Sequence, residues 1–167
     1  MENQLDIYIP QLEDLRFRQK MLADKRTMDY NIGFEPYDGY NPLDGTIEFP
    51  HQMWKRWHDG WTDKRNRCFY AYIVRKSDGV WVGDIAYHYR KNEDKPVIHI
   101  VIDAEFRGKG YSKEALILLC QAAKKNGVKR IYNDIPHNRI GAIKTHKAVG
   151  FKEVKNRGEY CYLVLDL

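Results

Sequence analysis

Residues 97–112 read VIHIVIDAEFRGKGYS, and this stretch decides the fold. The almost unbroken apolar run Val97–Ile102 is typical of a strand that is covered on both faces of a sheet. The segment Arg107–Ser112 follows it, and then Ser112–Lys125 repeats apolar residues at helical spacing until Gly127 ends the pattern. The stretch therefore predicts a central strand, a glycine-containing loop and a helix, in that order.

The rest of the chain supplies more strands and helices around this centre. Alternating apolar and polar residues predict a strand at Leu5–Ile9, and aromatic and β-branched residues predict strands at Cys68–Arg75 and Val80–Tyr89. We also expect a short strand at Arg130–Ile135 and two closing strands that start at Phe151 and Tyr160. Helical spacing predicts helices near Gln11–Lys25, His51–Asp63 and Arg139–Val149. A chain of 167 residues fits one domain, residues 1–167, of the α/β (α+β) class.

Composition narrows the possible classes of protein. The 43% of hydrophobic residues argues for a packed core, while the longest apolar run, Ala115–Cys120, is too short to span a bilayer and predicts no membrane partner. Cys68, Cys120 and Cys161 lie far apart, which predicts reduced core residues and a cytoplasmic protein. The cysteines and histidines show no ligand spacing, so we expect no metal site.

Charge is distributed unevenly along the chain. The segment Thr27–Pro50 has no Lys or Arg and carries five acidic residues, Asp29, Glu35, Asp38, Asp44 and Glu48. Because the whole chain carries +5, the remainder carries +10. An acidic, aromatic-rich segment is therefore set into a basic domain.

The loop after the central strand has the chemistry of an anion site. Glycines at 108 and 110 allow backbone N–H groups to converge, the next helix adds its positive dipole end, and Arg107 and Lys109 add full charge. The spacing matches neither the P-loop nor the dinucleotide-binding pattern. These features favour a diphosphate, and the alternative is a basic connector that binds nothing.

Two motifs resemble those of the GCN5-related N-acetyltransferases, the GNAT superfamily. Arg107, Gly110 and Ser112 fall on the first, fourth and sixth places of its Arg/Gln-x-x-Gly-x-Gly/Ala signature, with Ser in the last place. Residues 138–151 resemble the second motif, in which an Asn opens a helix that ends in Gly-Phe. The two motifs cover about a third of the chain, roughly residues 97–154.

The resemblance implies a fold and a cosubstrate. The fold would be a GNAT-like central mixed sheet, mostly antiparallel, of six to seven strands flanked by about four helices, with a splay between the fourth and fifth strands. Acetyl-CoA would be the acyl donor, with no metal. Its pantetheine arm would contact Val101 and Ile102, its diphosphate would contact Arg107, Gly108, Lys109, Gly110, Tyr111 and Ser112, and the second motif would add Asn138 and Ala142.

The resemblance also suggests proton carriers. Many family members have a Tyr where this chain has His146, which predicts His146 as the general acid; the alternative is a helix histidine with no role. The frequent family glutamate is replaced by residues 96–98, so the base stays open between Asp84, His99 and a water relay. If the turn between the two strands is symmetric, Asp84 pairs opposite Ile102 and Tyr87 opposite His99.

By family analogy the acidic segment lies over the acceptor site. Its aromatic residues, Tyr30, Phe34, Tyr37 and Tyr40, are then predicted to surround a cationic amine that carboxylates such as Glu35 neutralise. The alternative is a surface loop whose aromatic residues pack on Trp54 and Trp57.

Three functions follow from these features. The first is an N-acetyltransferase that moves an acetyl group from acetyl-CoA to a primary amine by direct attack in a ternary complex, with a small cationic acceptor or a peptide amine. The second is a non-catalytic acyl-CoA sensor with the same fold. The third, favoured least, is a nucleic-acid-binding domain that uses the basic residues Lys124, Lys125, Lys129 and Arg130. A homodimer remains open.

Overall fold

The computed structural model describes residues 3–34, 38–63 and 67–167, with the backbone alone at 155–157. Its helices are α1 (Leu15–Ala23), α2 (Lys25–Met28), α3 (His51–Thr62), α4 (Tyr111–Lys125) and α5 (Ile140–Val149). Its strands are β1 (Leu5–Tyr8), β2 (Phe69–Arg75), β3 (Trp81–Tyr89), β4 (Pro96–Ile102), β5 (Arg130–Pro136), β6 (Lys152–Arg157) and β7 (Tyr160–Asp166). The predicted order of strands and helices is confirmed, with the short helix α2 added after α1.

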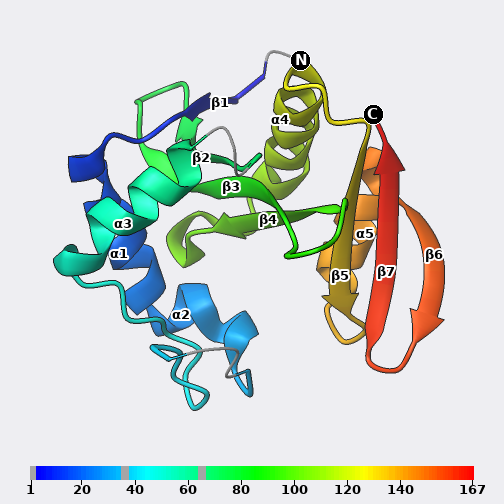
Figure 1. Cartoon of the computed structure of the whole chain (residues 1–167), viewed down its shortest axis with the longest axis horizontal. Coiled ribbons are helices and arrows are strands. Elements are labelled where there is room, and N and C mark those ends of the chain that lie inside the picture. Colours follow the sequence, from blue (N-terminus) through cyan, green and yellow to red (C-terminus); the bar gives the residue numbers. More distant parts are fainter. Residues whose placement is uncertain (1–2, 35–37, 64–66) are drawn as a thin grey trace.

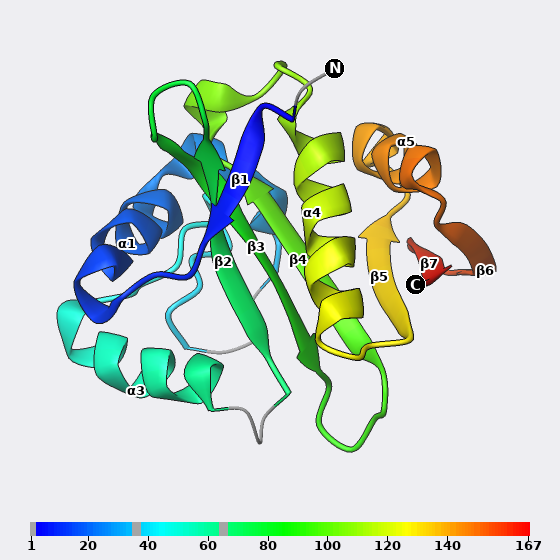
Figure 2. The same ribbon diagram turned by 90° about the horizontal axis from the view of Figure 1, so that it is seen from above.

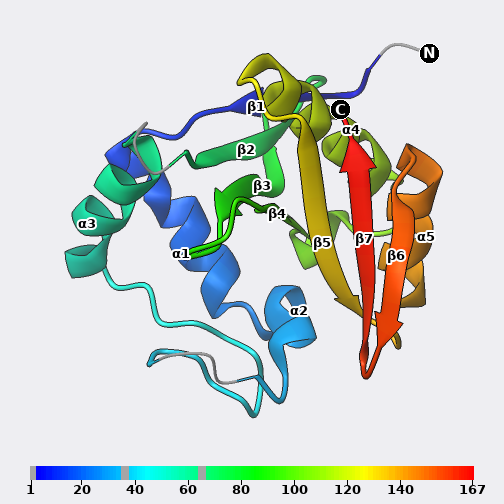
Figure 3. The same cartoon turned by 45° about the vertical axis from the view of Figure 1, so that its right-hand side comes forward.

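The strands form one sheet in the order β1-β2-β3-β4-β5-β7-β6. Neighbouring strands run antiparallel except β4 and β5, which run parallel. Within the described residues β4 and β5 pair only at Val97 and Tyr132, and the strands then separate (Figure 1 and Figure 3). The predicted mixed sheet and its splay between the fourth and fifth strands are confirmed.

Helices cover both faces of the sheet. Helix α4 contacts β1, β3, β4 and α5 on one face, whereas α1 contacts β3 and α3 contacts β2 on the other (Figure 2). The main core lies between the sheet and α4, where Ile85, Leu116 and Leu119 are completely buried. A second cluster joins α1 to α3 and includes Leu15 and Trp54.

The predicted helix Gln11–Lys25 is wrong at both ends. Residues 12–14 form a 3-10 turn, α1 begins at Leu15, and the chain is extended at Asp24. The Asp24 side chain accepts hydrogen bonds from the Arg26 N–H and the Thr27 hydroxyl, as expected of an aspartate that caps a new helix. The acidic segment Thr27–Pro50 begins within α2 and contains a 3-10 turn at residues 29–31 and a bridge between Tyr40 and Ile47.

The predicted pairing of β3 with β4 is wrong by one residue. Asp84 pairs with Val101 and Tyr87 with Ile98, since the turn at residues 90–95 closes symmetrically with Tyr89 opposite Pro96. A shift of one residue exchanges the two faces of a strand. In the observed register, Asp84 and His99 therefore lie on the same face of the sheet as diagonal neighbours.

Candidate active site

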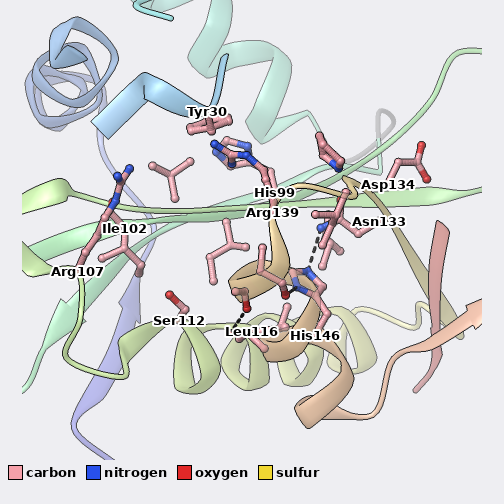
Figure 4. A pocket seen from close by; sticks show the side chains of 18 of the residues that line it. Tyr30, His99, Ile102, Arg107, Ser112, Leu116, Asn133, Asp134, Arg139 and His146 are labelled. Carbon is pink, nitrogen blue, oxygen red and sulfur yellow. Dashed lines mark hydrogen bonds between the residues drawn. The ribbon is translucent and has the colours of Figure 1, made fainter. Parts of the chain in front are cut away.

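A cavity of about 450 Å³ lies where β4 and β5 separate (Figure 4). Its walls come from β4, β5, the start of α4, helix α5 and residues 29–30. Five predicted cofactor residues line it: Val101, Ile102, Arg107, Ser112 and Ala142. The predicted catalytic residues His99 and His146 line it too, together with Tyr30 from the predicted acceptor side. The structure thus brings eight of the predicted site residues to one cavity.

The loop before α4 presents backbone donors. Gly108 and Gly110 have φ of 77° and 78°, in the left-handed region that glycine adopts without strain. A Cβ at either position would meet no atom within 4 Å, so it is φ that requires glycine there. The N–H groups of residues 108–110 have no acceptor within the described part of the chain, and the first turn of α4 leaves more N–H groups unpaired. These donors fit an anionic group such as a diphosphate.

The side chains of this segment contribute less than the backbone. Tyr111 is buried in the main core, so only its backbone belongs to the loop. The Lys109 ammonium is exposed beside the Phe106 ring, 5.5 Å from its centroid. The Arg107 guanidinium donates to the carbonyl oxygens of Arg26 and Thr27, at 2.9 and 2.6 Å. Its charge is therefore already engaged with the acceptor-side segment.

Asp84 is the buried charge beside the cavity. Its side chain is 2% exposed; Oδ2 accepts from the Tyr70 hydroxyl at 2.6 Å and from Arg18 Nη1 at 3.2 Å, and Oδ1 lies 2.9 Å from His99 Nε2. Burial disfavours the carboxylate, but the attraction and hydrogen bonds of His99, Arg18 and Tyr70 outweigh it and hold the pKa of Asp84 below its ordinary value. Asp84 is therefore a buried carboxylate that can influence the cavity through His99, which lines it.

Arg18 is held in an aromatic cluster. Its guanidinium carbon lies 4.4 Å from the centroid of the Trp57 ring and 5.2 Å from that of Tyr70. Burial works against its charge, but the neighbouring Tyr70 and Asp84 raise the pKa of Arg18 above its ordinary value. A cation of the chain itself therefore occupies the aromatic surface next to Asp84.

His99 connects this buried cluster to the cavity. Its side chain is 35% exposed and lines the cavity, while Nε2 faces Asp84. With the ring neutral and Nε2–H donated to the carboxylate, Nδ1 keeps a lone pair that has no partner among the described residues. This is the arrangement of a histidine base that a carboxylate orients.

His146 is buried and satisfied. Nδ1 donates to the Ala142 carbonyl at 2.8 Å, and Nε2 lies 2.9 Å from the Asn133 amide nitrogen and accepts from it. Burial lowers the pKa of His146, so the neutral ring is the favoured form. A neutral ring bonded in this way has no proton free for a leaving thiolate, so the predicted acid role requires the imidazolium and stays a prediction.

The acceptor side is only partly as predicted. Tyr30 packs against the cluster of Leu15 and Trp54, and the Arg139 guanidinium carbon lies 4.8 Å from the centroid of its ring. Phe34 lines an adjoining hollow together with Asn138, which does not line the main cavity. Glu35 and Tyr37 lie outside the described residues. The aromatic face of Tyr30 thus also holds an arginine of the chain.

Four residues of the site escaped sequence reasoning: Arg18, Tyr70, Asn133 and Arg139. A signal existed for Arg18, because it shares one helical face with Leu15 and Leu22, where a charge requires a partner. Tyr70 and Asn133 lie in ordinary strand patterns. Their roles depend on pairing across the sheet and on packing against helices, which no local pattern reveals.

In the residues that the structure describes, no three His, Cys, Asp or Glu side chains group as metal ligands would. Each helix in the same residues is too short or too polar to cross a bilayer.

Curated relatives of this chain come from Methanocaldococcus jannaschii. An uncharacterised N-acetyltransferase is 26% identical over 126 residues, which cover 72% of this chain and 53% of the relative. An uncharacterised protein is 28% identical over 108 residues, 64% of this chain and 22% of the relative. The chain thus spans about half the length of the first relative and about a fifth of the second.

Solved structures share the fold. A spermidine N-acetyltransferase from Vibrio cholerae, solved with CoA and spermine, matches with a TM-score of 0.73 at 14% identity, over 99% of this chain and 96% of that one. A domain from Methanocaldococcus jannaschii matches with a TM-score of 0.69 at 22% identity, over 99% and 100%. The family model described as an acetyltransferase (GNAT) domain matches residues 7–152 of this chain. With most of its length matched, the chain belongs to the GNAT acetyltransferase family.

Proposed function

We propose that this protein transfers the acetyl group of acetyl-CoA to a primary amine, with His99 as the general base and Asp84 as the residue that positions it. The observation that carries the proposal is the bond between His99 Nε2 and the buried Asp84 carboxylate, with His99 lining the cavity. The position of His99 on β4, where the sheet opens, supports its contact with the reacting amine.

The cosubstrate would be held mainly by backbone groups. The free N–H groups of residues 108–110 and the start of α4 suit its diphosphate, and the cavity walls at Val101 and Ile102 suit its pantetheine arm. In the Vibrio cholerae neighbour CoA is bound on the same fold. Bound acetyl-CoA supplies the thioester carbonyl that the amine attacks.

Acetylation of an ammonium substrate removes two protons from its nitrogen. His99 Nδ1 accepts the first and passes it to solvent, which gives the neutral amine that can attack. The N–C bond then forms and the C–S bond breaks. The second proton leaves the nitrogen and ends on the CoA sulfur. The sequence predicts that His146 delivers this last proton, and the His146→Phe experiment below tests it.

The acceptor that we would test first is a small cationic amine. The acidic segment supports it, because Asp29 lines the cavity. The spermine bound by the Vibrio cholerae neighbour supports it as well. Arg18 and Arg139 already occupy aromatic faces near the site, which favours acceptors that do not require an empty aromatic cage. A peptide amine is the second class to test. The wide separation of the three cysteines in the sequence suits a reducing compartment such as the cytosol.

An acceptor screen tests the proposal. The protein is incubated with acetyl-CoA, a thiol reagent and a panel of polyamines, amino acids and peptides, and release of the CoA thiol is followed. We expect amine-dependent release, together with a rise of the melting temperature with acetyl-CoA. A thermal shift with no release across the panel would favour the acyl-CoA sensor. Salt-sensitive DNA binding with no thermal shift would favour the nucleic-acid-binding domain.

A further inference from the structure

Arg107 occupies the first place of the cofactor signature, yet its guanidinium is bound to another part of the protein. Nη1 donates to the Arg26 carbonyl at 2.9 Å, Nη2 to the Thr27 carbonyl at 2.6 Å, and Nε to the Ile102 carbonyl at 3.2 Å. Nη1 also lies 3.4 Å from Asp29 Oδ1. One side chain thus joins the end of β4 to the end of α2.

A second bond fastens the same two segments together. The Ala104 N–H donates to the Thr27 hydroxyl oxygen at 3.0 Å. Thr27 is completely buried, and its hydroxyl in turn donates to Asp24 at 2.8 Å. Residues 102–107 and residues 24–29 therefore form a continuous polar seam.

The seam lies between the two functional parts of the cavity. Gly108, directly after Arg107, begins the run of free backbone donors, while Tyr30, directly after Asp29, lines the cavity on the acceptor side (Figure 4). A diphosphate that fixes the backbone of residues 108–112 also fixes the base of the Arg107 side chain. The guanidinium then fixes the carbonyl groups that precede Tyr30.

We propose that Arg107 is a positioning residue for the acceptor side: its guanidinium ties the acceptor-side segment 26–30 to the cofactor loop, so that binding of acetyl-CoA orders the place where the amine binds. The inference rests on the proposed function. It differs from the role that the resemblance implies for Arg107, because a guanidinium that binds the diphosphate would have to leave three carbonyl oxygens.

Arg107→Gln is the most informative variant. Gln is the other residue that the family signature allows at this place, so the backbone loop should keep its shape and its affinity for acetyl-CoA. The shorter amide side chain cannot span three carbonyl groups. Lys109→Ala is the matched control, since Lys109 lies in the same loop and makes no bond to residues 24–30.

Three measurements separate the possible roles: calorimetry with acetyl-CoA, KM for the amine, and hydrogen exchange of residues 24–31 with and without CoA. In the parent, CoA should slow exchange in residues 24–31. In Arg107→Gln that protection should be lost and KM for the amine should rise about tenfold, in the range of ordinary coupling between sites, with acetyl-CoA affinity within about twofold of the parent. Lys109→Ala should weaken acetyl-CoA binding and leave the protection of residues 24–31 by CoA unchanged.

The outcomes distinguish this inference from the proposed function. If Arg107→Gln weakens acetyl-CoA binding and leaves the amine KM and the protection unchanged, Arg107 is a diphosphate ligand and the inference is overturned. If the parent binds CoA but residues 24–31 gain no protection, the inference alone fails. If the parent gives no heat with acetyl-CoA, the proposed function fails and takes the inference with it.

Discussion

The cofactor side and the acceptor side of the cavity present different kinds of chemical group. On the cofactor side, residues 101–112, the functional groups are backbone amides shaped by two left-handed glycines and by the start of α4. On the acceptor side the functional groups are side chains, with Asp84 at the centre of bonds to Arg18, Tyr70 and His99. A site made of backbone groups can be kept with many different side chains, whereas a buried ionic cluster is destabilised when one of its partners is replaced.

His99→Ala should give the largest effect and tests the acceptor side directly. Loss of the base should lower kcat by about 100-fold to 10,000-fold at neutral pH, the usual range for general base catalysis. Steady-state thiol release measures it, and acetyl-CoA affinity should not change. His51→Ala, at an exposed histidine on α3, is the matched control and should keep the parent rate. A His99→Ala enzyme with the parent rate would remove His99 from the reaction.

Asp84→Asn should be the most destabilising of these changes. It leaves the Arg18 charge buried without its carboxylate partner, which costs about 3–5 kcal/mol in unfolding free energy. Urea unfolding measures this cost. The control is Asp78→Asn, in the exposed turn after β2, where loss of the solvent-screened Arg75 ion pair should cost far less. Equal costs for the two variants would contradict the assignment of Asp84 as the buried centre.

Acid should lower the stability that the Asp84 cluster contributes to the fold. The folded-state pKa of Asp84 is lowered, so the stability that its charge contributes is complete above the unfolded pKa, about 3.9, and is lost as pH falls through the folded value. The parent should therefore lose this contribution only below about pH 4, and Asp84→Asn should lack this part of the acid transition.

Gly110→Ala sharpens the cofactor side of the comparison. The substitution forces a Cβ into a left-handed conformation, which costs about 1 kcal/mol, and it disturbs the amides at the start of α4. The disturbed amides should lower the affinity for acetyl-CoA about tenfold, which corresponds to a loss of about 1.4 kcal/mol in binding free energy. The matched control is Gly127→Ala, with φ of 83° and no neighbour within 4 Å of a Cβ, at the far end of α4. It should show the same loss of stability and no loss of affinity.

His146→Phe tests the residue between the two sides, and its effect should be the smallest. Because burial lowers the pKa of His146, the unfolded chain takes up a proton near pH 6.5 when the folded chain does not, so the parent loses stability as pH falls below 6.5. The variant should lose less stability than the parent between pH 7 and 5.5, as urea unfolding at the two pH values measures. Part of the slope should remain, since burial also lowers the pKa of His88.

The same variant measures the acid role that the sequence predicts. If His146 donates the proton to the leaving thiolate, kcat should fall while acetyl-CoA affinity is kept. Equal kcat for His146→Phe and the parent would make His146 a packing residue that holds Asn133.

The contrast also explains what the sequence could predict. The order of strands, the splay and the loop donors depend on local patterns and on two motifs, and they were predictable. The link between Asp84 and His99 was missed, because the predicted pairing of the two strands lay one residue away from the one that a symmetric turn at residues 90–95 gives. A displacement of one residue moves the two side chains to opposite faces. Arg107 was assigned to the anion from its place in the motif, whereas its long side chain reaches across to α2.

The opening between β4 and β5 leaves a strand edge inside the sheet instead of at its border, since the two strands pair at one position. Unpaired strand edges are the places where a strand from another molecule can add. A pantetheine arm with its own amide groups would cover this inner edge. Protein stored without the coenzyme should then associate and precipitate more readily than protein kept saturated with it.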